Sequence, residues 1–244
     1  MKFVRLGVIV ACMLALAIAA RAEDAATPPK PVSATAKLGY VHTGGNTDVL
    51  TMLAGDKLDW VSGHWTLKQD ADAVYGKDHS VENAGRYSFG LRGDYTMTAR
   101  VSSYALASWR RNTFGGINRQ FDEGVGLVFH AISPKPQLLD LEAGAGLTQR
   151  EDIAYLEDNF ATGRLAGLYQ RTFHENSTFQ LSSAWVVNLQ DTGDSQLDSR
   201  VSLAAPVESW LSLNLGYDSL YRSQPLPGFE NTDWTVSAGL QLTY

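Results

Sequence analysis

The chain has 244 residues and a formal net charge of −6, with 26 acidic against 20 basic side chains. This acidic balance disfavours nucleic acid as a partner, because the phosphate backbone recruits basic surfaces. The single cysteine, Cys12, excludes a disulfide framework, and the length suits one large all-β domain or two small ones.

The first 22 residues predict a secretory signal peptide. Lys2 and Arg5 precede an apolar run over residues 6–19, and Ala20-Arg21-Ala22 fits a small-x-small cleavage site. The run is shorter than the roughly 20 residues needed to span a bilayer, which disfavours a membrane anchor. Residues 23–32 are polar and rich in Ala and Pro, so we expect a flexible periplasmic segment ahead of the folded domain.

From residue 33 to residue 244 the sequence alternates apolar and polar residues in segments separated by turn-forming residues. In the last segment Val236, Ala238 and Leu240 occupy one face, and Ser237, Gly239 and Gln241 occupy the other. This period of two is typical of half-buried antiparallel strands. Twelve strands are expected, over residues 33–42, 48–60, 64–76, 83–95, 100–111, 118–132, 137–150, 159–173, 177–190, 195–206, 209–222 and 232–244.

Three features favour a transmembrane antiparallel β-barrel over a soluble sandwich. The strands often reach ten or more residues, whereas soluble strands usually run about five or six. The strand count is even, as in bacterial single-chain barrels. Aromatic residues recur near strand ends, as expected of interfacial girdles; they are Trp60, Trp65, Tyr95, Trp109, Phe173, Phe179, Trp210 and Tyr244.

The connections between the expected strands alternate in length and polarity. Turns such as residues 61–63 and 134–136 are short, whereas residues 150–158 and 223–231 are longer and more polar. Short periplasmic turns and longer outer loops match the bacterial outer membrane, and both termini then face the periplasm. The expected partners are outer-membrane lipid, lipopolysaccharide and, through the terminal strand ending at Tyr244, the barrel-assembly machinery.

The polar face of the strands must point into the lumen, because charge that faces lipid is unfavourable. The alternation therefore predicts a lumen charge network of both signs. We expect ion pairs that neutralise one another in preference to a selective pore lining, because buried charges normally pair. The residues placed inside are Lys37, Lys57, Asp59, Lys68, Asp70, Asp72, Arg86, Arg92, Asp94, Arg110, Asp122, Asp140, Glu142, Arg164, Asp198, Arg200, Asp218 and Arg222.

The segments 38–48, 121–128 and 139–146 resemble a family of outer-membrane proteins of unknown function, domain-of-unknown-function 481. Some members of that family are described as salt-induced. The resemblance covers nearly all of the chain after the signal peptide, and it implies a single barrel at the outer membrane without implying a reaction or catalytic residues. The family carries a Thr-Gly-Asn-Thr-like turn in its early hairpin. The corresponding residues here are Thr43, Gly44, Gly45, Asn46 and Thr47, and their types suit a tight turn with positive φ.

The sequence shows no constellation typical of a catalytic or metal site. The five histidines are scattered, and His130 with Ser133 or His79 with Ser80 are near only along the chain. A Ser/His hydrolase needs those groups within hydrogen-bond reach. The acid-rich residues 151–158 and 191–194 could hold Ca²⁺ through oxygen ligands, but they lack an EF-hand pattern. A solvated acidic loop is the simpler explanation.

We therefore expect no catalytic residue, no metal and no cofactor. The expected role is envelope integrity under osmotic or salt stress, or passage of a small solute. The alternative is an outer-membrane hydrolase that modifies lipids, of the phospholipase or deacylase type.

Overall fold

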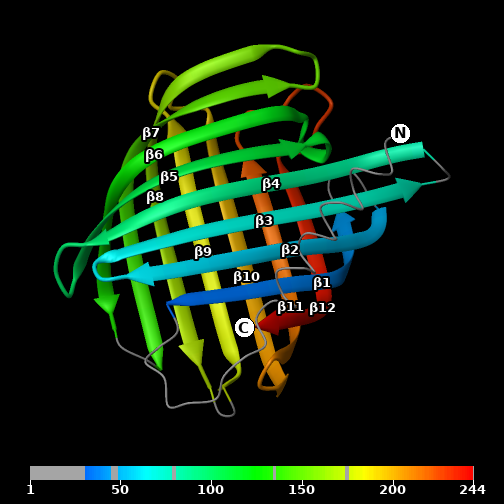
Figure 1. Ribbon diagram of the computed structural model, residues 1–244. Coiled ribbons are helices and arrows are strands. Elements are labelled where there is room, and N and C mark those ends of the chain that lie inside the picture. Colours follow the sequence, from blue (N-terminus) through cyan, green and yellow to red (C-terminus); the bar gives the residue numbers. More distant parts are fainter. Residues whose placement is uncertain (1–30, 45–48, 79–80, 134–135, 174–175, 244) are drawn as a thin grey trace.

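The computed structural model describes residues 31–44, 49–78, 81–133, 136–173 and 176–243. Alternating apolar and polar side chains fold these residues into twelve strands, with a short 3-10 turn η1 (Thr113–Gly115) before β6 (Figure 1). The strands are β1 (Val32–Gly44), β2 (Val49–Ser62), β3 (Trp65–Asp78), β4 (Val81–Thr96), β5 (Val101–Asn112), β6 (Ile117–Ile132), β7 (Gln137–Asp152), β8 (Glu157–Thr172), β9 (Thr178–Asn188), β10 (Ser195–Glu208), β11 (Leu211–Arg222) and β12 (Thr232–Thr243).

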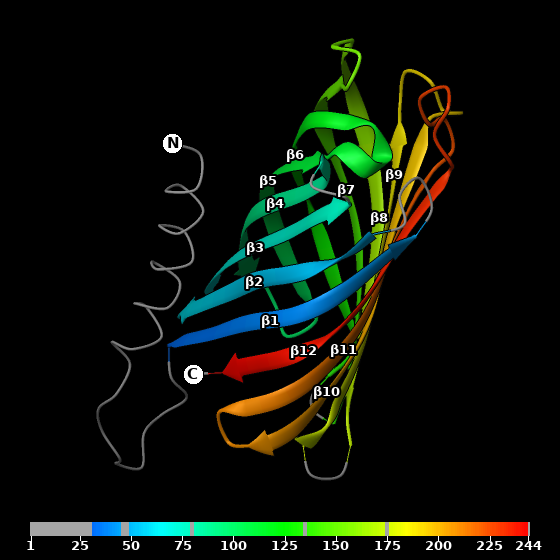
Figure 2. The same ribbon diagram turned by 90° about the vertical axis from the view of Figure 1, so that its right-hand side faces the viewer.

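Each strand is antiparallel to its neighbours in the chain, and β1 pairs with β12 to close the sheet into a barrel. Figure 2 shows β1 and β12 side by side at this seam. The register there places Gly39 opposite Gly239. The predicted all-β antiparallel barrel of twelve strands is confirmed, and every strand boundary lies within two residues of its expected position. Among the residues described, no helix is long and apolar enough to cross a membrane.

Apolar side chains cover the outer face of the barrel. Leu91, Leu127 and Leu215 are each at least half exposed, as expected of side chains that contact hydrocarbon instead of a protein core. We call the end of the barrel at which β1 begins and β12 ends the termini end, and the opposite end the loop end. Exposed aromatic residues lie near both ends of the barrel. Near the termini end the ring centroids of Trp65 and Tyr95 lie 4.9 Å apart, and near the loop end Tyr155 and Tyr221 are exposed. Of the expected aromatic positions, Tyr244 lies outside the described residues.

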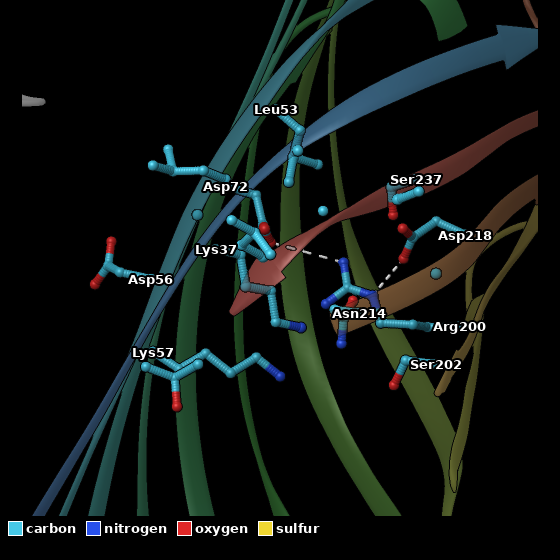
Figure 3. A pocket seen from close by; sticks show the side chains of 18 of the residues that line it. Lys37, Leu53, Asp56, Lys57, Asp72, Arg200, Ser202, Asn214, Asp218 and Ser237 are labelled. Carbon is cyan, nitrogen blue, oxygen red and sulfur yellow. Dashed lines mark hydrogen bonds and ion pairs between the residues drawn. The ribbon is translucent and has the colours of Figure 1, made fainter. Parts of the chain in front are cut away.

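Two carboxylates interrupt this apolar outer face. Asp56 alternates with the lumen-facing Lys57 on β2, and Figure 3 shows their side chains pointing away from one another. The Asp56 carboxylate accepts a hydrogen bond from the side chain of Gln69 on β3. Glu123 on β6 is exposed and lies opposite Leu147, an outward residue of β7. Neither acid belongs to the predicted lumen charge network.

One expected long loop is shorter than predicted. Strand β7 continues to Asp152 and β8 begins at Glu157, so most of residues 150–158 belongs to the sheet. Three of its four acidic groups pair with arginines: Glu151 and Glu157 with Arg119 at 2.6 and 2.8 Å, and Asp158 with Arg150 at 3.3 Å. The fourth, Asp152, accepts hydrogen bonds from backbone amides of the connection. The long connection expected between β11 and β12 is present, over residues 223–231.

Candidate functional site: the charged lumen

Because side chains alternate along each strand, the charged residues predicted from the sequence lie on the inner face of the barrel, opposite the exposed leucines. Neighbouring strands then place opposite charges side by side. The register sets Lys57 opposite Asp70 and Asp59 opposite Lys68 across the β2–β3 pair. These four positions alternate with outward residues such as Leu58, so they line one wall of the lumen.

Two ion pairs cross the lumen instead of following the wall. Arg110 on β5 lies 3.3 Å from Asp198 on β10, and β6, β7, β8 and β9 separate these strands along the wall. Arg200 on β10 reaches Asp72 on β3 at 3.6 Å, across β11, β12, β1 and β2. Figure 3 shows the Arg200 guanidinium between Asp72 and Asp218; it donates a hydrogen bond to Asp218 and forms an ion pair with Asp72. The long arginine side chains therefore subdivide the interior.

A neighbouring cluster joins four strands nearer the termini end. Arg92 on β4 pairs with Asp94 at 2.8 Å and with Glu142 on β7 at 2.9 Å. Glu142 also accepts from Arg164 on β8 at 3.3 Å, and Lys68 reaches Asp94 at 3.1 Å. Each acid thus contacts more than one cation, so opposite charges neutralise one another in a restricted space.

Other expected lumen residues contact polar groups of the strands and connections. Arg86 donates to the hydroxyl of Thr235 on β12 at 3.3 Å, and Arg222 donates to the carbonyl oxygen of Gly115 at 2.5 Å. Asp140 accepts from the ring of His130 at 2.7 Å. Asp122 forms an ion pair with Arg110 and accepts hydrogen bonds from Gln120 and Thr148. Lys37 and Asp218 line the cavity of Figure 3.

The pairs leave limited space within the lumen. A cavity of about 290 Å³ remains beside β4–β10, lined by Arg92, Arg110, Arg164 and the acids Asp122 and Asp198. A second cavity, around Arg200, holds about 40 Å³, close to the share of one water molecule in the liquid. The interior around these two cavities is polar and divided by charged side chains.

The loop end is narrowed by contacts between connections that are far apart in sequence. Arg222, at the end of β11, is buried and binds the carbonyl of Gly115 in η1. The amide of Ile153 donates to the carbonyl of Gly116 at 3.0 Å. Gly116 has φ +74° and packs against Leu226, where a Cβ atom would lie 2.9 Å from that side chain. Three connections therefore meet over the lumen.

The expected turn motif is only partly described. Thr43 and Gly44 are the last residues of β1, whereas Gly45, Asn46 and Thr47 lie outside the described residues. The sequence pattern also did not predict which lumen side chains contact one another across the barrel. Alternation assigns a residue to the inner face, but the partner of Arg110 depends on strand order and on the height of each residue in the barrel.

Comparison with known proteins agrees with this architecture. The uncharacterized protein YdiY of Escherichia coli (strain K12) is 22% identical over 226 residues, covering 90% of this chain and 87% of that protein. The NanC porin matches with a TM-score of 0.57 at 10% identity, over 85% of this chain and 98% of that one. The translocator domain of the autotransporter NalP from Neisseria meningitidis matches with a TM-score of 0.50 at 11% identity, over 99% and 96%. At these identities the solved structures show the fold alone.

A family model described as a protein of unknown function, DUF481, matches residues 36–244, which include eleven strands completely and most of β1. This match confirms the family expected from the sequence. The chain belongs to the DUF481 family.

Proposed function

We propose that the protein resides in the bacterial outer membrane and lets only small polar solutes pass through a lumen constricted by ion pairs. The observation that carries the proposal is the pair of cross-lumen bridges, Arg110–Asp198 and Arg200–Asp72. Barrels of eight strands are filled by side chains, and those of sixteen or more enclose an aqueous channel. At twelve strands the long charged side chains decide how much of the interior stays open.

The barrel fold and the apolar outer face support the membrane location. The fold is shared with a porin, and the outward leucines would be unfavourable on a protein surrounded by water. The cavity of about 290 Å³ beside the cross-lumen ion pairs supports the passage of small solutes. The cross-lumen arginines restrict the flow of larger solutes.

Conductance of the refolded protein in planar bilayers tests this proposal. The native barrel should show a small conductance, because Arg110 and Arg200 bridge the lumen. Arg110→Ser and Arg200→Ser should each increase it, and the double variant should increase it further. Arg111→Ser is the matched control, because Arg111 is exposed on the opposite face of the same strand.

Two results would contradict the proposal. A large, steady conductance from the native barrel would show an open channel. No permeation of the smallest solutes through the native protein, together with unchanged conductance in the double variant, would instead favour a purely structural role in envelope integrity.

A further inference from the structure

Three lumen-facing side chains on adjacent strands form a continuous hydrogen-bonded chain at the termini end of the barrel. The hydroxyl of Ser102, at the start of β5, lies 2.9 Å from Nε2 of His130, near the end of β6. Nδ1 of His130 lies 2.7 Å from the carboxylate of Asp140, near the start of β7. Figure 1 shows β5, β6 and β7 side by side. The sequence considered His130 only with Ser133 and missed this arrangement.

The geometry matches the roles of a nucleophile, a base and an orienting carboxylate. A carboxylate on Nδ1 fixes the imidazole tautomer, so that Nε2 can accept the proton of the serine hydroxyl. Both distances lie within the range of about 2.6–3.2 Å that such pairs show. The three residues stand on paired strands instead of mobile loops, which holds them in this geometry.

The chemical partners of Asp140 set it apart from other acids of the lumen. Asp94, Glu142 and Asp198 each form ion pairs with an arginine. In the part of the chain that the structure describes, Asp140 is hydrogen-bonded to the ring of His130 and forms no ion pair with an arginine or a lysine. The Asp140 carboxylate therefore acts on the imidazole of His130, and it is not needed to neutralise the arginines of the lumen.

We propose that Ser102 is an acyl-accepting nucleophile, with His130 as its general base and Asp140 as the residue that positions the ring. Ser102 Oγ bonds to the carbonyl carbon of an ester, and its proton moves to His130 Nε2. The tetrahedral intermediate collapses, the ester C–O bond breaks, and the alcohol leaves with that proton. Water then gives a proton to His130 and attacks the acyl group, which releases the acid and restores the serine hydroxyl.

The position of the three residues determines the class of substrate. They face the polar lumen, on the side of the wall opposite the apolar surface where bilayer lipid would lie. Ser102 is only 3% exposed, and the side chain of His130 is 26% exposed. A water-soluble ester with a short acyl group can approach along the lumen, whereas a phospholipid in the bilayer cannot. The substrate class is thus small soluble esters, and this differs from a lipid-modifying hydrolase.

Covalent labelling of the refolded, full-length barrel tests the proposal. Diisopropyl fluorophosphate should modify Ser102, as located by mass spectrometry, and p-nitrophenyl acetate should be hydrolysed. Ser102→Ala should abolish both signals, and His130→Gln should slow both by about 100-fold or more. Asp140→Asn should slow them as well. Ser108→Ala is the matched control, because Ser108 lies on the same face of β5 and contacts Asp122 instead of an imidazole. A p-nitrophenyl palmitate ester should not react.

Absence of label on Ser102 in the native barrel, with folding verified by the faster gel migration of the unheated sample, would overturn the proposal. Labelling of Ser102 at the same rate in wild type and in a folded His130→Gln variant would also overturn it. Either result would identify the three residues as a structural hydrogen-bond chain.

Discussion

At the scale of single residues, the side chain of Asp56 is the group most at odds with its surroundings. It lies on the outer face of β2, opposite Ala36 of β1 and two residues from the exposed Leu58, and its hydrogen bond comes from Gln69. The alternation that places Lys57 and Asp59 inside requires Asp56 to point outward. The rule that charges face the lumen therefore fails here, although strand periodicity gives the correct face.

Replacing Asp56 by Ala should stabilise the barrel in lipid. A basic residue that faces lipid at the bilayer midplane destabilises a barrel by about 2–4 kcal/mol, and an acidic residue does so by less. We therefore expect Asp56→Ala to raise the free energy of unfolding by about 1 kcal/mol. Urea unfolding in lipid vesicles measures it. Asp59→Ala on the same strand is the control and should give no gain, since Asp59 lies opposite Lys68 in the lumen. A loss of stability in Asp56→Ala would refute the lipid-facing assignment.

At the scale of strands, periodicity and turn residues were enough to predict all twelve elements and their antiparallel order. They were not enough to predict contacts between distant strands. His130 and Asp140 flank one short turn, so their pairing follows from a single hairpin register. Ser102 belongs to a third strand, and its approach to His130 requires the register of the β5–β6 pair as well. The cross-lumen contact of Arg110 with Asp198 depends on closure of the whole sheet.

Closure of the barrel depends on two glycines that face one another at the β1–β12 seam. A Cβ atom on Gly239 would lie 2.1 Å from the carbonyl oxygen of Leu38, and the obstacle is backbone that cannot rotate away. Gly239→Ala should therefore destabilise the folded barrel by about 1–3 kcal/mol or more. The measurement is the fraction of unheated protein that migrates as folded barrel. Gly167→Ala, whose added Cβ would meet its nearest atoms at 3.8 Å, should fold normally. Equal folding of both variants would contradict a tight seam.

At the scale of the whole molecule, the even number of antiparallel strands places the start of β1 and the end of β12 at the same end of the barrel. β1 begins and β12 ends at the termini end, next to turns such as residues 209–210, whereas residues 189–194 connect strands at the loop end. A signal peptide cleaved after Ala22 would leave the new terminus, Glu23, in the periplasm. Residues 1–30 lie outside the described residues, so the cleavage site stays a prediction from the sequence.

Orientation in the membrane can be read from the reactivity of single cysteines, because Cys12 is the only cysteine and lies in the expected signal peptide. Thr192→Cys, exposed in the β9–β10 connection, should react with a maleimide on a polymer of about 5 kDa in intact cells. Such a polymer is too large for a lumen restricted by side chains. Ser209→Cys, exposed in the β10–β11 turn, should react only after the outer membrane is permeabilised. The reverse labelling pattern would show that the barrel has the opposite orientation in the membrane. Equal reactivity of both cysteines in intact cells would contradict a membrane-spanning barrel with its termini in the periplasm.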